Sequence, residues 1–121
     1  GNTGPYLLYT YARAKSILRK AKHQKNKIKK APTPELNTSE KSLILQLSNF
    51  PEIVKEAYTN LAPNLIANYA FQLAQTFNEF YHSSQVIGSE NESFRLELVN
   101  VFSTVLKNSL NLLGIDPLEE M

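Results

Sequence analysis

The chain has 121 residues and no cysteine. This length suffices for one domain with its own core, and the composition excludes disulfides and cysteine-based metal sites. Its formal net charge of +2 hides an uneven distribution, because nine of the thirteen Lys and Arg residues lie in residues 1–34, which contain no Asp or Glu. No apolar run approaches the roughly 18–20 residues that span a bilayer. Aromatic residues among these cations are typical of an RNA-binding surface.

The first expected helix starts at Pro5, with Asn2 or Thr3 as its cap. Apolar residues at steps of three and four predict the side on which it packs: Leu7, Tyr11, Ala14, Leu18 and Ala21. A different, adjacent face carries Tyr6, Tyr9, Arg13 and Lys20. The apolar repeat stops at Ala21, because Lys25 occupies the next core position. The sequence thus separates a packing side from a presented face.

Residues 22–39 are expected to form a basic, proline-containing linker inside a single domain of residues 1–121. Beyond it, helical spacing predicts helices at about 38–48, 51–60, 63–82 and 92–113, with Thr38 or Ser39 capping the first of them. Two apolar stripes predict that the last helix is buried on much of its circumference, and Gly114 suits its end. The expected fold class is therefore all-α, a bundle of about five helices.

Catalysis has little support in the sequence. His23 and His82 lie in unlike contexts, and neither has a carboxylate or a second histidine at ligand spacing. Acidic residues that lie close together, such as Glu90 and Glu92, occupy polar positions. Phosphate-binding loops, zinc motifs and nucleophile elbows are absent. We expect no catalytic residue, no metal and no cofactor in this chain.

The face that carries tyrosines and arginine is the stronger candidate site. Tyr9 and Arg13 are four residues apart, so their side chains can meet on one helix surface. An aromatic ring can stack on an unpaired base, and a guanidinium can stack, bind phosphate or reach a base edge. Three flanking cations are expected to contact phosphates: Lys15, Arg19 and Lys20. The alternative is that Tyr6 and Tyr9 pack on a neighbouring helix while Arg13 pairs with a glutamate.

Three blocks of sequence support a more specific hypothesis. Residues 3–20 read Thr-Gly-Pro-Tyr-Leu-Leu-Tyr-Thr-Tyr-Ala-Arg-Ala-Lys-Ser-Ile-Leu-Arg-Lys, residues 63–81 end in Phe-Asn-Glu-Phe-Tyr, and residues 112–121 begin with Leu-Leu-Gly-Ile and end in Met. In this order they resemble the opening, central and final blocks of the C-terminal anticodon-binding domain of arginyl-tRNA synthetases. Because the chain lacks an initiator Met and begins within the first block, we expect it to be a domain of a larger protein.

The resemblance implies a helical domain that binds the anticodon stem-loop of arginine tRNA. It places Tyr9 and Arg13 among the anticodon contacts, and Tyr81, His82 and Met121 in segments that border the same pocket. It also implies a parent arginine–tRNA ligase in the cytoplasm, whose catalytic domain holds the ATP and arginine sites outside this chain and is a further partner. No DNA or membrane partner is implied.

The sequence also departs from the family pattern. Tyr11 stands where many members have His, and it lies on the apolar side, so we assign it to packing. Asn64, Ser109 and Glu120 replace a His, a frequent Gly and an Arg. The last replacement removes a cation near the expected RNA surface. Asn78 matches the asparagine of the family's Phe-Asn-x-Phe-Tyr block. It either belongs to the site or only braces the helices.

Two other functions remain open from sequence alone. The first is a helical protein-interaction bundle whose basic tail binds an acidic partner. The second is a basic helix over residues 13–30 on an anionic membrane, which ranks last because it has no apolar face beyond Ala21.

Overall fold

The computed structural model describes residues 3–23 and 35–119, which form five helices. Their bounds are α1 Thr3–His23, α2 Thr38–Ser48, α3 Phe50–Thr59, α4 Asn64–Ser83 and α5 Glu92–Leu112. No strand occurs within these two ranges, so the predicted all-α fold with about five helices is confirmed. The linker predicted at 22–39 overlaps the end of α1 and the start of α2, and the rest of it falls mostly on residues 24–34, outside the described residues.

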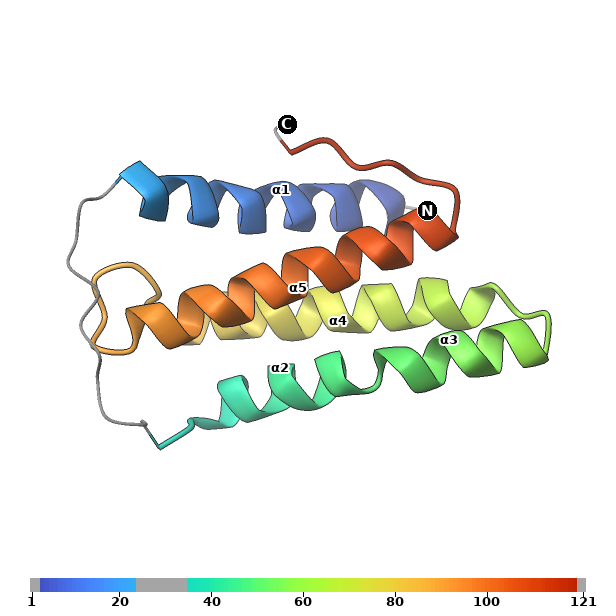
Figure 1. The fold of residues 1–121 in the computed structure, drawn as a ribbon, viewed down its shortest axis with the longest axis horizontal. Coiled ribbons are helices and arrows are strands. Elements are labelled where there is room, and N and C mark those ends of the chain that lie inside the picture. The colour runs from blue at the N-terminus through green and yellow to red at the C-terminus, as the bar shows by residue number, and fades with distance from the viewer. Residues whose placement is uncertain (1–2, 24–34, 120–121) are drawn as a thin grey trace.

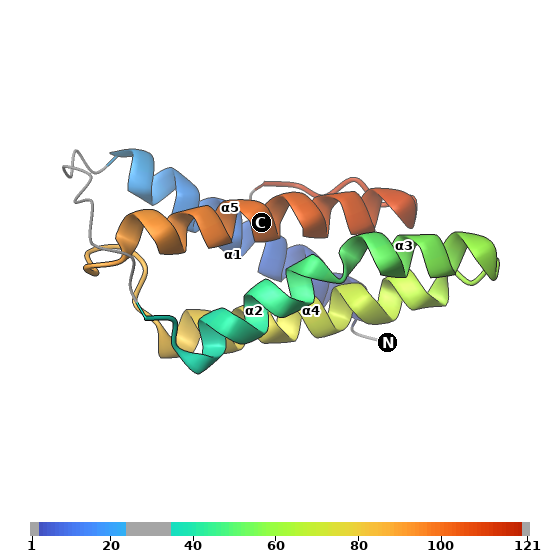
Figure 2. The same cartoon turned by 60° about the horizontal axis from the view of Figure 1, so that its bottom comes forward.

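The helices form an up-and-down bundle (Figure 1). α1 and α4 run in one direction, and α2, α3 and α5 run in the other. Figure 2 shows α2 and α3 following each other along α4, which also packs against α1 and α5. After α5 the chain turns back and runs beside α1 (Figure 1). The C-terminal segment therefore lies close to the helix that carries the predicted site.

The core lies where α1, α4 and α5 meet, with one contribution from α2. Its largest fully buried apolar side chains are Tyr11, Leu43, Leu73, Phe77, Phe80, Val99, Phe102, Leu106 and Leu110. The rings of Phe77 and Phe102 stack with centroids 4.0 Å apart. Such burial of large side chains supplies most of the driving force for folding, at roughly 25 cal/mol per Å² of apolar surface.

The predicted packing side of α1 is correct for its first half only. Leu7, Tyr11 and Ala14 are buried, whereas Leu18 and Ala21 are partly exposed and Ile17 is buried instead. Because α1 packs against both α4 and α5, its buried side is wider than one row of residues.

The prediction that α5 is buried on much of its circumference is correct only in part. Of one apolar stripe, Val99, Phe102, Leu106 and Leu110 are buried. Of the second, Leu98 is buried and Val105 partly buried, whereas Val101 and Leu112 are 39% and 53% exposed. The neighbours of α5 (α1, α2 and α4) leave that side of the helix open to solvent.

The helix ends show which polar residues act as caps. α2 is capped by Asn37 rather than by Thr38 or Ser39. The Glu40 amide donates to Asn37 Oδ1 and the Asn37 amide donates to Glu40 Oε1, each at 2.8 Å, which completes a capping box. α1 begins at Thr3, two residues before the predicted start, so Thr3 lies within the helix, and Asn2 lies outside the described residues.

Gly114 ends α5 as predicted. It has a φ of +83°, and its amide donates to the Asn111 carbonyl at 3.0 Å. The next amide, of Ile115, donates to the Leu110 carbonyl at 2.8 Å. This pair of bonds is the Schellman motif, in which glycine adopts a left-handed conformation at low cost.

A buried ion pair ties three segments together. Glu40, only 1% exposed, accepts a hydrogen bond at Oε2 from Arg95 Nε at 3.0 Å. Arg95 Nη1 also donates to the Gln85 carbonyl oxygen at 2.6 Å. The pair thus joins the start of α2, the start of α5 and the loop that leads out of α4.

A second buried polar contact predicts how stability depends on pH. The Tyr69 hydroxyl donates to the Gln46 carbonyl at 2.7 Å, and burial raises the pKa of Tyr69 to about 12. Because the pKa of an unfolded tyrosine is about 10, only the unfolded chain loses this proton between those two values. The contribution of Tyr69 to the free energy of unfolding is therefore expected to be fully present below about pH 10 and to be lost as the pH rises towards 12.

Urea unfolding at several alkaline pH values measures this effect. Tyr69→Phe is expected to lower stability at neutral pH by about 1 kcal/mol, the usual contribution of one hydrogen bond. It is also expected to make the loss of stability at alkaline pH less steep. Part of that loss remains, because burial, Glu119 and Asp116 raise the pKa of Tyr11 too. An alkaline decline that is as steep in Tyr69→Phe as in the wild type would contradict the assignment.

Candidate functional site

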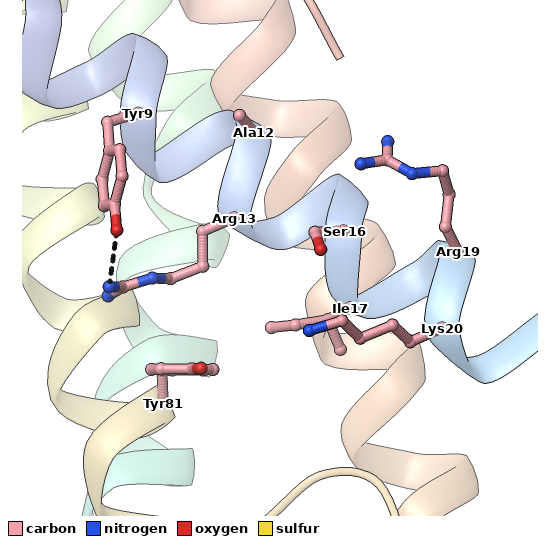
Figure 3. Close-up of a pocket in the computed structure, with 8 residues that line it drawn as sticks. All are labelled: Tyr9, Ala12, Arg13, Ser16, Ile17, Arg19, Lys20 and Tyr81. Carbon is pink, nitrogen blue, oxygen red and sulfur yellow. Dashed lines mark hydrogen bonds between the residues drawn. The ribbon is translucent and has the colours of Figure 1, made fainter. Parts of the chain in front are cut away.

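A surface pocket of about 440 Å³ opens between α1 and the last turns of α4. Figure 3 shows the eight residues that line it, and all but Tyr81 come from α1. They are Tyr9, Ala12, Arg13, Ser16, Ile17, Arg19, Lys20 and Tyr81. Nine residues were assigned to binding from the sequence, and the structure brings five of them together here: Tyr9, Arg13, Arg19, Lys20 and Tyr81.

The Arg13 guanidinium occupies the centre of this cluster. Its Nη1 donates to Asn78 Oδ1 at 2.9 Å, and its Nη2 donates to the Tyr9 hydroxyl at 3.3 Å. Its Cζ lies 4.6 Å from the ring centroid of Tyr81 and 5.1 Å from that of Tyr9 (Figure 3). The planar guanidinium group therefore lies between two aromatic rings, and its hydrogen bond to Asn78 fixes its orientation.

Asn78 connects α4 to α1 beneath the pocket. Its Nδ2 donates to the Tyr6 hydroxyl at 2.8 Å and to Thr10 Oγ1 at 3.2 Å, and Thr10 is fully buried. Its Oδ1 accepts from Arg13. Because these groups use both its donor and its acceptor, Asn78 braces the two helices, and it is not among the residues that line the pocket.

Tyr6 and Tyr9 have different environments although both were placed on one face. Tyr6 is partly buried, and its ring packs on Phe71 with centroids 5.4 Å apart. Tyr9 is 54% exposed and lines the pocket. The alternative in which the tyrosines pack on a neighbouring helix describes Tyr6 and not Tyr9. Among the described residues Arg13 is held by an asparagine and a tyrosine rather than by a glutamate.

Two cations of α1, Lys15 and Arg19, contact the C-terminal segment. Lys15 Nζ lies 3.7 Å from Glu119 Oε1, and Arg19 Nη1 donates to the Glu119 carbonyl oxygen at 3.1 Å. Glu119 is 60% exposed, so its ion pair with Lys15 contributes at most about 1 kcal/mol. Lys15, unlike Arg19, is not part of the pocket lining.

The remaining predicted site residues lie at the border of the pocket or outside the described chain. His82 is exposed, and its ring meets that of Tyr81 edge-on, with centroids 5.3 Å apart. It does not line the pocket. Met121 lies outside the described residues.

A second pocket, of about 280 Å³, adjoins the first and was not predicted from the sequence. Its lining consists of Ile17, Lys20, Tyr81, Ser84, Gln85, Val86 and Ile87. Residues 83–91 are polar enough to predict a loop, but nothing in their spacing predicts that the loop folds back against α1.

Residues 3–23 and 35–119 contain no group of three or more His, Cys, Asp or Glu side chains placed to hold a metal ion. Within the same ranges, none of the helices combines the length and the apolar character needed to cross a membrane.

Comparison with known proteins places the chain in a family. Residues 7–121 match the profile of the DALR anticodon binding domain. The arginine–tRNA ligase of Flavobacterium psychrophilum is 40% identical over 124 residues, and that of Pyrococcus furiosus is 43% identical over 129 residues. Each match covers all of this chain and 20% of the relative, so the chain spans about a fifth of the length of the curated relatives it matches.

Solved structures give the same result. The chain superposes on Thermus thermophilus arginyl-tRNA synthetase with a TM-score of 0.84 and 34% identity, over 100% of this chain and 21% of that one. For the Plasmodium falciparum arginyl-tRNA synthetase the TM-score is 0.82 and the identity 33%, over 100% and 22%. With a family profile that matches from Leu7 onwards, and with this fold, the chain belongs to the DALR anticodon-binding domain family.

Proposed function

We propose that this chain binds the anticodon stem-loop of arginine tRNA and positions the tRNA for aminoacylation by the catalytic domain of an arginine–tRNA ligase. The observation that carries the proposal is the cluster of Tyr9, Arg13 and Tyr81 on the surface of a DALR domain. It combines two exposed aromatic rings with a pre-oriented guanidinium, which are the groups that bind an unpaired base.

Each residue has a distinct part in this proposal. Tyr9 offers a ring for stacking, and Arg13 offers its remaining N–H groups to a base edge. Lys20 at the rim supplies a phosphate contact. Arg19 and Lys15 contribute less, because each must give up its contact with Glu119 to reach a phosphate. Tyr6 acts indirectly, since its hydroxyl holds Asn78.

The chemistry of the ligase lies elsewhere in this proposal. ATP and arginine bind the catalytic domain, and the present chain contributes no catalytic residue and no cofactor site. The protein works in the cytoplasm, where tRNA is charged, with its own catalytic domain as a second partner. His82, whose ring contacts that of Tyr81, borders the anticodon pocket.

The first test is the variant Tyr9→Ala. We expect it to weaken binding of an arginine anticodon stem-loop by about 1–3 kcal/mol, the usual range for one base stacked on one aromatic ring. Fluorescence anisotropy with a labelled stem-loop measures the change. Tyr58→Ala is the matched control, because Tyr58 is an 84% exposed tyrosine on α3. Unchanged affinity in a folded Tyr9→Ala variant would remove Tyr9 from the site.

Salt dependence and a second RNA separate this proposal from the other functions. The logarithm of the binding constant is expected to fall with the logarithm of salt concentration by roughly 0.7 per phosphate neutralised in a single strand. An unrelated stem-loop of equal length is expected to bind more weakly. Equal affinity for both RNAs would leave only a general cation effect. Salt-independent binding of the stem-loop would contradict the proposed phosphate contacts.

A further inference from the structure

The adjoining pocket shares one wall with the Tyr9–Arg13 pocket. Ile17, Lys20 and Tyr81 line both, so the two cavities meet along the ring of Tyr81 and the stem of Lys20. A cation at the junction of two cavities suits a phosphate that links two nucleotides. This placement suggests that a single strand of nucleic acid crosses from one pocket to the other.

The floor of the second pocket is a braced loop. Ser84 is 3% exposed, and its hydroxyl accepts from Asn37 Nδ2 at 3.0 Å, which fixes the loop to the start of α2. The Gln85 carbonyl accepts from Arg95, whose other partner is the buried Glu40. The loop is thus held from two helices before any ligand binds, as a binding site requires.

The Gln85 side chain is pre-oriented as well. Its Nε2 donates to the Ile87 carbonyl at 2.9 Å, which fixes which side of the amide carries the oxygen. No described residue donates to its Oε1, and a second hydrogen remains on Nε2. Gln85 is exposed and lines the pocket. It therefore presents one acceptor and one donor side by side, the pattern with which amide side chains read the edges of bases.

The rest of the lining is apolar and suits a flat ring. Ile17 and Val86 are buried at the base of the pocket, with exposures of 7% and 6%, and Ile87 is partly buried beside them. A nucleobase has a broad, flat apolar face and a polar edge, whereas a phosphate has no apolar face and a ribose offers only a small one. The lining and the amide together match a base better than any other part of a nucleotide.

We propose that the pocket around Gln85 is a second nucleotide subsite, which takes the unpaired base adjacent to the one bound at Tyr9 and Arg13. The base lies on Ile17, Val86 and Ile87 with its edge on the Gln85 amide, and Lys20 contacts the phosphate between the two nucleotides. The proposal rests on the proposed function, and it makes Gln85 a specificity-determining residue.

The experiment uses the 121-residue chain and arginine anticodon stem-loops in which each unpaired nucleotide in turn is made abasic. Removing a base without its phosphate isolates the contribution of that base. The wild type is expected to lose on the order of tenfold in affinity at each of two adjacent positions, in line with the contribution of one read or stacked base. Gln85→Ala is expected to abolish the loss at one of the two positions and to leave the other intact. Tyr9→Ala is expected to show the reverse pattern.

Two further variants keep the result interpretable. Gln85→Met preserves the length of the side chain without the amide, so it separates base reading from loop packing, and thermal unfolding confirms that each variant is folded. Gln75→Ala is the matched control, because Gln75 is an exposed glutamine on α4 that lines neither pocket. We expect Gln85→Met to behave like Gln85→Ala and Gln75→Ala to behave like the wild type.

The outcomes distinguish the subsite from the function on which it rests. A wild type that loses affinity at a single position, with a profile that Gln85 variants leave unchanged, overturns the subsite and keeps the proposed function. If the wild type binds the arginine stem-loop no more tightly than an unrelated stem-loop, or binds neither RNA, the proposed function is overturned and the subsite with it.

Discussion

Replacing Glu40 by alanine is expected to lower the free energy of unfolding by about 3–5 kcal/mol, the usual cost of removing one partner of a buried ion pair. The side chain of Arg95 is only 14% exposed and would be left without its carboxylate. The same change removes the Glu40 half of the capping box at Asn37. Chemical denaturation of the purified chain measures the loss.

Three further variants test the cause of this effect. Glu52→Ala removes an exposed glutamate from the first turn of α3 and is expected to change stability by less than about 0.5 kcal/mol. Glu40→Gln keeps one of the two acceptor oxygens, so it can accept from Asn37 or from Arg95 but not from both as Glu40 does, and it is expected to cost less than alanine. Glu40→Leu combined with Arg95→Met removes both charges and should recover part of the loss. A double variant no more stable than Glu40→Ala would show that the unpaired Arg95 charge is not the cause.

The same ion pair links stability to the second pocket. Arg95 holds the carbonyl of Gln85 as well as Glu40, so loosening the pair also releases the loop that presents the Gln85 side chain. The charged pair therefore also fixes the position of this loop. The loop has only Val86 buried in the core and therefore little hydrophobic support of its own.

The helices could be predicted from the sequence because their signals are local. Apolar residues at steps of three and four, and a glycine after the last helix, report on neighbours within one or two turns. The capping box was missed because three consecutive polar residues, Asn37, Thr38 and Ser39, are all good caps. The choice among them depends on Glu40, whose other carboxylate oxygen is held by Arg95, 55 positions along the chain.

The candidate site could likewise be predicted from the sequence only where its contacts are local. The meeting of Tyr9 and Arg13 follows from their spacing on one helix, whereas Tyr81 came only from resemblance to a family, because it reaches the site from α4. Tyr6 and Tyr9 have similar sequence contexts, and tertiary contacts separate their environments: Tyr6 packs on Phe71 and accepts a hydrogen bond from Asn78, whereas Tyr9 lines the pocket. Gln85 gave no signal, since a polar residue in a polar loop is ordinary and its position depends on tertiary contacts.

Replacing Arg13 by alanine is expected to have the largest effect on binding. It removes the planar guanidinium group that lies between Tyr9 and Tyr81, and with it the charged hydrogen-bond donor that Asn78 orients. Hydrogen bonds from charged groups contribute about 1.5–3 kcal/mol and one stacked base about 1–3 kcal/mol. We therefore expect the arginine stem-loop to bind about 2–4 kcal/mol more weakly, which is roughly 30-fold to 1,000-fold in the dissociation constant. Anisotropy titration measures the change, with thermal unfolding to confirm the fold.

Arg13→Lys decides whether the geometry or the charge of Arg13 matters. Lysine keeps the positive charge but has neither a plane to stack between the rings nor a fixed fork of donors. We expect Arg13→Lys to lose nearly as much affinity as Arg13→Ala while its salt slope stays at the wild-type value. Lys20→Ala should do the opposite: a modest loss for every stem-loop and a slope reduced by roughly 0.7, the share of one phosphate. Lys107→Ala, an exposed lysine on α5, is the control for a change of charge alone. Wild-type affinity in Arg13→Lys would mean that Arg13 acts only as a point charge. The planar shape of its guanidinium group between Tyr9 and Tyr81 would then have no part in recognition.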